Sequence, residues 1–143
     1  MDRHDEFVTD ELPGSIRRLT EEECWELVDV ATVGRLGFVA DGDVKIIPLN
    51  YMVDVDVIIR TLPDGIIAKL AGTRVTFEVD YHSDQGAGWS VLMHGDLKVL
   101  PADEADLVRR WNRVLPWAGG NRSLFLSFHA DQVDGRRVTR QRN

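Results

Sequence analysis

Residues 33–61 read VGRLGFVADGDVKIIPLNYMVDVDVIIRT, and this stretch predicts three consecutive β-strands. Val33 to Ala40 and Val44 to Val53 are rich in apolar and β-branched residues and flank Asp41-Gly42-Asp43, a turn-forming sequence typical of a hairpin. A third run with dense β-branched residues, Val55 to Thr61, follows closely. The stretch therefore favours a mainly β, antiparallel fold.

Three later segments continue the strand pattern. Arg74 to Tyr81 alternates apolar and polar residues, which is typical of a strand with one buried face. Trp89 to Leu100 is long enough for a strand, and Gly95 within it predicts a kink. Ser123 to Phe128 predicts a last short strand. In the hairpin, Pro48 requires an edge position or a bulge, because proline cannot donate a ladder hydrogen bond.

Two helices are expected beside these strands. Thr20 and Glu23 have the spacing of a capping box, which predicts a helix that begins there and ends near Val30. Asp103 to Leu115 carries apolar residues at helical spacing and is followed by Pro116. About six strands with short connections and two peripheral helices indicate a closed or partly closed antiparallel barrel rather than a parallel sheet.

The length of 143 residues corresponds to one domain. Residues 1–18 lack periodicity and contain Pro13-Gly14, so we expect an N-terminal arm there. The domain is expected over residues 19–138, with a basic C-terminal tail at 139–143. Two interpretations of the arginines near this end stay open: a solvated tail, or a contact with an acidic region of a second copy.

The composition argues against several classes of partner. Seventeen Lys and Arg against 24 Asp and Glu give a net charge of -7. Nucleic acids and anionic membranes both require a basic surface, so neither is expected as a partner. No apolar run approaches the ~20 residues of a membrane span. Because Cys24 is the single cysteine, an internal disulfide is excluded. We therefore expect a cytoplasmic protein.

The sequence contains no familiar catalytic or metal-binding motif. Its histidines are scattered without the spacing of a metal site, so no metal is expected. Ser90 does not lie in a Gly-x-Ser-x-Gly elbow. Cys24 is expected to be a buried structural residue, because neighbouring acids raise the pKa of a thiol. No residue is therefore assigned as catalytic.

One local grouping suggests a phosphate site. Arg60 and Thr61 end a predicted strand, and Lys69 follows after the turn Pro63-Asp64-Gly65. A guanidinium, a hydroxyl and an ammonium group that converge can hold a phosphate through charge-assisted hydrogen bonds. The alternative is that Arg60 and Lys69 are ordinary solvated side chains. The residues alone leave both interpretations open.

A wider pattern includes this grouping. Its other segments are Thr32 to Leu36, Ile47 to Tyr51, Trp89 to Val91 and Gly135 to Val138. In order and spacing they resemble the flavin-binding split-barrel superfamily, most closely the small proteins similar to pyridoxamine 5'-phosphate oxidase, which include nitroimidazole-reductase-like members. The resemblance implies a six-stranded antiparallel split β-barrel of the FMN-binding type. It also implies a homodimer with FMN in a cleft between two protomers.

The resemblance implies three groups of cofactor contacts. The implied phosphate ligands are Arg60, Thr61 and Lys69. The segment beside the flavin ring, which acts mainly through backbone groups, is Pro48, Leu49, Asn50 and Tyr51. Further implied contacts are Ser90 and, from the partner protomer, Trp111, Trp117 and Arg122. For Trp111, packing within its helix remains the open alternative.

The implied function is an FMN-binding oxidoreductase that acts on a small molecule by hydride transfer through the flavin. Because the flavin carries its own redox chemistry, the protein does not need an acid–base dyad. Two alternatives stay open: a deazaflavin-dependent reductase, and a flavin-binding carrier or sensor module without turnover. The sequence does not disclose the substrate or the electron donor.

Overall fold

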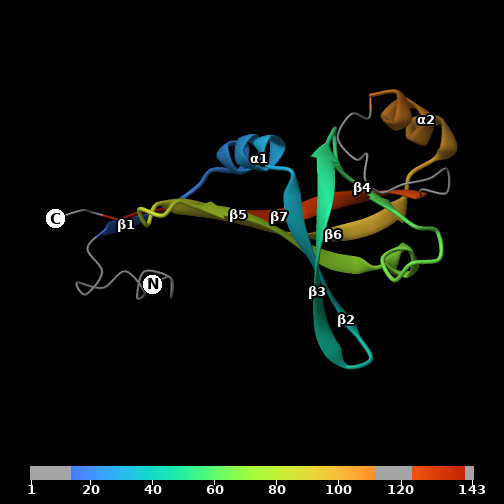
Figure 1. Ribbon diagram of the computed structural model, residues 1–143, viewed down its shortest axis with the longest axis horizontal. Coiled ribbons are helices and arrows are strands. Elements are labelled where there is room, and N and C mark those ends of the chain that lie inside the picture. Colours follow the sequence, from blue (N-terminus) through green and yellow to red (C-terminus); the bar gives the residue numbers. More distant parts are fainter. Residues whose placement is uncertain (1–13, 112–123, 141–143) are drawn as a thin grey trace.

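The computed structural model describes residues 14–111 and 124–140, which form a mainly β fold (Figure 1). Its helices are α1 (Glu21–Val30), α2 (Ala102–Trp111) and a short 3₁₀ helix (Ala68–Leu70). Its strands are β1 (Gly14–Arg18), β2 (Val33–Ala40), β3 (Asp43–Val53), β4 (Val57–Thr61), β5 (Arg74–His82), β6 (Gly88–Val99) and β7 (Leu124–Arg140).

The strands of the described chain form one antiparallel sheet in the order β1-β7-β4-β3-β2-β5-β6. An additional pairing between β6 and β7 closes the sheet, so that β2 to β7 form a ring and β1 lies outside it. The expected six-stranded antiparallel split barrel is confirmed. Gly14–Arg18 was expected to belong to the arm but forms β1, because its backbone pairs with the distant end of β7.

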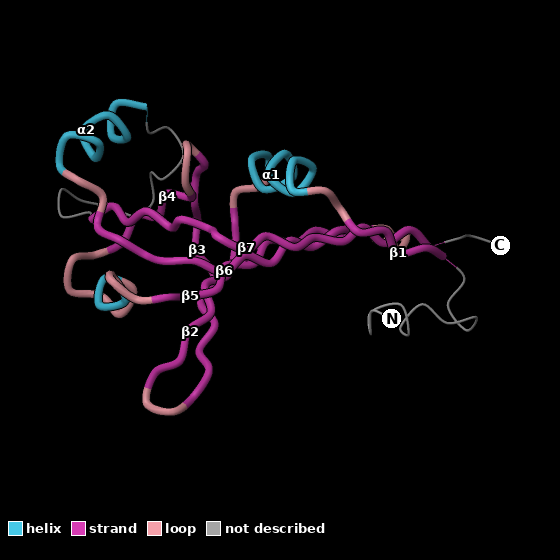
Figure 2. Tube along the Cα trace, turned by 180° about the vertical axis from the view of Figure 1, so that it is seen from behind, coloured by secondary structure: helices cyan, strands magenta, loops and turns pink. Residues whose placement is uncertain are grey.

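The β2–β3 hairpin projects from the barrel, as both views show (Figures 1 and 2). β2 pairs with β5 only over Arg35–Gly37. Beyond Gly37, therefore, the two strands of the hairpin pair only with each other. Pro48 pairs with Arg35 on β2, whereas the β3–β4 ladder covers only Tyr51–Val53. At Pro48, therefore, β3 has a ladder partner on one side only, which is the edge position that the sequence predicted.

A bulge between β6 and β7 lies at the predicted kink. His94 pairs with Gln132 and the next residue, Gly95, pairs with Ala130, which leaves Asp131 as an extra residue on β7. A methyl group on Gly95 would lie 1.9 Å from the His129 carbonyl oxygen, so the bulge requires glycine. The extra residue reverses the alternation along β7, which runs to Arg140 and not to Phe128 as expected.

The described residues form two apolar clusters, one inside the ring of strands and one outside it. The main one fills the barrel, and α1 contributes Cys24 and Val28 to it. The predicted capping box of Thr20 and Glu23 is present at the start of this helix. The second cluster joins α2 to the outside of β4 and β7 and contains Ile58, Leu100, Ala105, Val108 and Phe125. In the part of the chain that is described, neither helix is long and apolar enough to span a membrane.

Candidate functional site

Strand β5 has two different faces. Val75, Phe77 and Val79 point into the barrel and are buried. The alternate residues point outward, as strand geometry requires, and lie in a hollow of about 890 Å³. The hollow is bounded by the outer faces of β2, β3, β5 and β6 and by the segment around Leu70.

A group of three charged side chains lies in this hollow. Arg35 on β2 donates from Nη1 to Glu78 Oε1 at 2.8 Å and to Asp80 Oδ2 at 2.9 Å. Burial, with the hydrogen bond to Asp80, raises the pKa of Glu78 to about 7, although Arg35 favours the charged form. The hydrogen bond from Glu78 and the bonds from Arg35 hold the pKa of Asp80 below its usual range. Near neutral pH, therefore, this carboxyl pair is only partly ionised.

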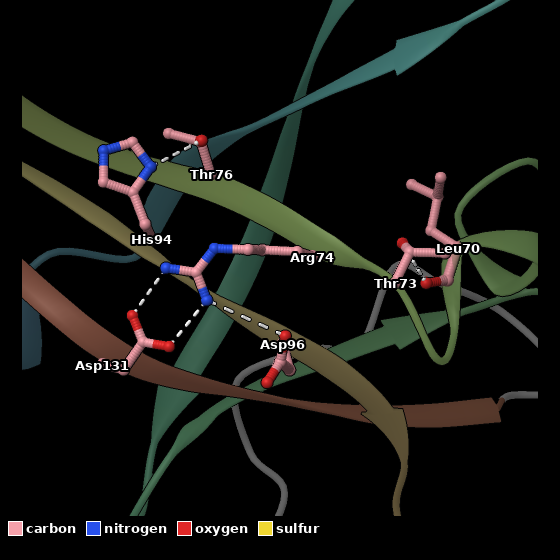
Figure 3. A network of polar contacts seen from close by, with 7 residues as sticks. All are labelled: Leu70, Thr73, Arg74, Thr76, His94, Asp96 and Asp131. Carbon is pink, nitrogen blue, oxygen red and sulfur yellow. Dashed lines mark hydrogen bonds and ion pairs between the residues drawn. The ribbon is translucent and has the colours of Figure 1, made fainter.

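Two further polar pairs lie near the bulge, and three of their four residues, Arg74, Thr76 and His94, line the same hollow (Figure 3). Arg74 holds Asp131 in a bidentate ion pair with N–O distances of 2.6 and 2.7 Å. The hydroxyl of Thr76 and Nδ1 of His94 are 2.9 Å apart. Asp131 is the extra residue of the bulge, so the irregularity of β7 places a carboxylate opposite Arg74.

Three of the expected cofactor residues lie on the same outer face as the hollow. Pro48 pairs with Arg35, and Ser90 pairs with Asp80, so both adjoin the charged group. Asn50 is half-buried and pairs with Val33 on β2. Alternation along β3 places Asn50 and Pro48 on one face, whose side chains are accessible.

Leu49 and Tyr51 face the opposite way, into the barrel. Tyr51 is 1% exposed, its ring packs edge-on against Phe77, and its hydroxyl donates to the Val28 carbonyl oxygen of α1. Burial raises the pKa of Tyr51 above its usual value. These two residues can reach a cofactor only through backbone groups, which is how the resemblance implied they would act.

Two of the three expected phosphate ligands, Arg60 and Thr61, are the last residues of β4, and the third, Lys69, lies in the segment that follows. The Arg60 guanidinium lies over the Phe125 ring, 5.9 Å from its centroid, on the outer face. Thr61 faces the following turn, where a methyl group on Gly65 would lie 3.7 Å from its Oγ1. Lys69 is exposed on the 3₁₀ helix Ala68–Leu70.

The β3–β4 register relates Asn50 on β3 to Arg60 on β4. Tyr51 and Ile59 are the last pair of the β3–β4 ladder, and Asn50 and Arg60 each lie one residue beyond it. Because Tyr51 and Ile59 are buried in the barrel, alternation places the side chains of Asn50 and Arg60 on the outer side of the sheet, as it does that of Pro48.

The remaining expected contacts lie at or beyond the end of α2. Trp111 is its last residue, and its side chain falls outside the described part of the structure. Trp117 and Arg122 lie outside the described residues as well.

The sequence reasoning did not identify the charged group of Arg35, Glu78 and Asp80. The two acids are two residues apart on a strand with strict alternation, which already places them on one face. The sequence gives no sign that Arg35 lies beside them, because that contact depends on the pairing of β2 with β5.

Comparison with known proteins independently supports the split-barrel fold. Residues 20–137 match the family model described as pyridoxamine 5'-phosphate oxidase. A search of curated proteins found no match.

Among solved structures, the FAD binding protein from Mycobacterium smegmatis is 31% identical, with a TM-score of 0.72 over 85% of this chain and 98% of that one. A FAD-binding protein from Mesorhizobium loti is 24% identical, with a TM-score of 0.68 over 87% and 98% of the two chains. The FAD and heme binding protein from Mycobacterium smegmatis is 15% identical, with a TM-score of 0.63 over 88% and 74%.

The family model spans nearly all of the described barrel, from the N-cap of α1 to Arg137 near the end of β7. The arrangement of the strands and the 31% identical neighbour agree with it. The chain belongs to the pyridoxamine 5'-phosphate oxidase family.

Proposed function

We propose that this protein is an FMN-binding oxidoreductase that acts on a small molecule by hydride transfer. The observation that carries the proposal is the outer side of the sheet at the end of the β3–β4 ladder, where Pro48 and Asn50 on β3 and Arg60 on β4 share one side within a fold of this family. The 31% identical structure, named as a FAD binding protein, supports a flavin as the ligand class.

Each group of residues has a distinct role in this proposal. Arg60, Thr61 and Lys69 hold the phosphate through charge-assisted hydrogen bonds. Pro48 and Asn50, which are accessible on the outer face of β3, orient the flavin ring. Leu49 and Tyr51 are buried and hold β3 in the core. A bound flavin supplies the redox chemistry, so the chain needs only to bind, orient and shield it.

The working unit in this proposal is a cytoplasmic homodimer with the cofactor between two protomers. The projecting hairpin supports this, because an isolated pair of strands is only marginally stable in water. The partner would supply contacts to the cofactor from the α2 end, where Trp111 lies.

Fluorescence titration of the purified chain with FMN, FAD and a deazaflavin tests the cofactor assignment. We expect the tightest binding for FMN. Tighter binding of FAD or the deazaflavin would correct the cofactor but keep the site, whereas no binding of any of the three at micromolar concentration would contradict the proposal. Flavin that binds but is not reduced by any nicotinamide donor or by a reduced deazaflavin would favour the carrier or sensor module.

Arg60→Ala tests the site itself. We expect flavin affinity to fall by about 1.5–3 kcal/mol, or roughly 10- to 150-fold, the range for a hydrogen bond to a charged group. Arg17→Ala is the matched control, because Arg17 is an exposed arginine paired with Glu23 on α1. Circular dichroism of both variants checks that the fold is kept. An unchanged affinity for Arg60→Ala would remove this residue from the site.

A further inference from the structure

One rung of the sheet joins two aromatic residues to two arginines. Its members, one from each of β5, β6, β7 and β1, are Tyr81, Trp89, Arg137 and Arg17. Residues that are directly paired in an antiparallel sheet have their side chains on the same side, about 5 Å apart. We call this row the aromatic–arginine rung.

The rung lies on the side of the sheet that α1 covers, just beyond the helix. Val91 and Gly135, two residues away from Trp89 and Arg137, are buried beneath α1, and a methyl group on Gly135 would lie 2.5 Å from the Cys24 sulfur. Alternation therefore turns the rung to this same side. Figures 1 and 2 show that these strands continue past α1 toward β1, and no described helix lies over them there.

The aromatic half of the rung is accessible to a ligand. Tyr81 is 59% exposed. Trp89 is half-buried, and part of its side chain packs against the main apolar cluster, which holds the indole in place. Neighbouring rings on a sheet form a platform on which a planar ligand can stack, as nucleic-acid bases do on other β proteins.

The two arginines of the rung differ in their partners. Arg17 donates from both terminal nitrogens to the Glu23 carboxylate, at 3.1 and 3.0 Å, so its charge is offset. Arg137 is half-buried and forms no ion pair or side-chain hydrogen bond with any residue that the structure describes. Because like charges directly opposite each other destabilise a sheet, an anion bound by Arg137 would be favourable here.

This end of the sheet is positive although the chain as a whole is acidic. On the next rung, Arg18 on β1 pairs with Arg136 on β7. Two neighbouring rungs of a chain with a net charge of -7 therefore carry four arginines. A local positive charge attracts small anions, and the planar guanidinium of an arginine can bind a phosphate through two parallel hydrogen bonds.

We propose that the aromatic–arginine rung binds a small aromatic phosphate of the nucleoside monophosphate class. The base stacks on Trp89 and Tyr81, and the phosphate accepts hydrogen bonds from Arg137. Trp89 and Arg137 are directly paired, so one small ligand can contact both. Ser90 follows Trp89 and faces the other side of the sheet, so this site is separate from the proposed cofactor site and does not depend on it.

Isothermal titration calorimetry of the purified chain with AMP, adenosine and inorganic phosphate tests the proposal. We expect saturable binding of AMP with a Kd of about 1 mM or lower. Adenosine and phosphate should each bind at least roughly tenfold more weakly, because each lacks one of the two contacts. Equal binding of AMP and phosphate would overturn the stacking, and equal binding of AMP and adenosine would overturn the role of Arg137. No binding of AMP at millimolar concentration would overturn the site.

Arg137→Gln tests the anion contact. This change removes the charge, and we expect the affinity for AMP to fall by roughly tenfold or more. Lys98→Gln is the matched control, because Lys98 is an exposed cation at the other end of β6 and should leave the affinity unchanged within about twofold. Circular dichroism checks that both variants keep the fold. Equal affinities in the two variants would remove Arg137 from the site.

The stacking contact is tested at Tyr81, because Trp89 packs against the core and its replacement could disturb the fold. Tyr81→Leu removes the ring at an exposed position. The affinity for AMP should fall several-fold, whereas the affinity for inorganic phosphate should not change. A variant that binds AMP as tightly as the native chain would remove Tyr81 from the platform.

Arg60→Ala separates this site from the proposed cofactor site, since AMP and FMN both carry a phosphate. We expect Arg60→Ala to bind AMP as the native chain does, within about twofold. A loss as large as that in Arg137→Gln would place AMP in the cofactor site and overturn this inference. A chain that binds AMP at the rung but binds no flavin would contradict the proposed function and leave this inference in place.

Discussion

The two faces of β5 show how one strand serves two purposes. The inner residues Val75, Phe77 and Val79 are buried among apolar side chains from every part of the barrel. The outer residues Glu78 and Asp80 contact Arg35 in a hollow that is open to solvent. The inner face stabilises the fold through tight packing, and the outer face presents titratable groups that contribute little to stability. Substitutions on the two faces should therefore differ in both size and kind.

Phe77→Ala should have the largest effect. Phe77 is fully buried, contacts the rings of Tyr51 and Phe128, and lies over Gly34, where even a methyl group would be 2.4 Å from its Cζ. Truncation removes these contacts and leaves a cavity, so the free energy of unfolding should fall by about 3–5 kcal/mol. Urea denaturation measures it, with Phe77→Leu as the milder control. A loss under about 1 kcal/mol would contradict the central place of Phe77 in the core.

Tyr51→Phe should have an intermediate effect. The ring stays in the core, but the hydrogen bond from the hydroxyl to the Val28 carbonyl oxygen is lost. We expect the free energy of unfolding to fall by about 0.5–1.5 kcal/mol. Tyr81→Phe is the matched control, because Tyr81 is 59% exposed, and it should change stability by less than about 0.5 kcal/mol. Equal effects in the two variants would show that the Tyr51 hydroxyl does not attach α1 to β3.

Arg35→Ala should have the smallest effect on stability and a clear effect on titration. Arg35 is 48% exposed, and such ion pairs contribute about 0–1 kcal/mol. Its loss removes the cation that favours ionised Glu78, so the pKa of Glu78 should rise above its present value of about 7. Carboxyl chemical shifts followed by NMR across pH 5–9 measure this. Arg74→Ala, whose ion pair is with Asp131, should leave Glu78 nearly unchanged, and a fall in the pKa of Glu78 in Arg35→Ala would contradict the assignment.

The sequence predicted most of the barrel because the determining signals are local. Turn residues at Asp41-Gly42-Asp43, alternation over 74–81 and the cap of Thr20 with Glu23 each depend on nearby residues only. The two errors, at β1 and in β7, have one physical origin. β1 is a strand only because distant residues of β7 pair with it, and Asp131 shifts the alternation that would have marked the rest of β7.

The candidate site was predictable only in part. The resemblance singled out Pro48, Asn50 and Arg60 as cofactor residues, and alternation alone separates Pro48 and Asn50 from Leu49 and Tyr51. The sequence of this strand does not indicate which side chains lie next to each of its two faces, because strand pairing is set by contacts between residues far apart in the chain.

By itself, then, the sequence determined the antiparallel class, the positions of the turns and helix cap, and the two faces of each regular strand. These follow from hydrogen bonding and side-chain alternation within a few residues. Only the tertiary structure decided the closure of β6 on β7, the bulge at Asp131 and the contact of Arg35 with Glu78 and Asp80. These depend on long-range pairing, which buries one face of each strand and thereby fixes which side chains meet on the other.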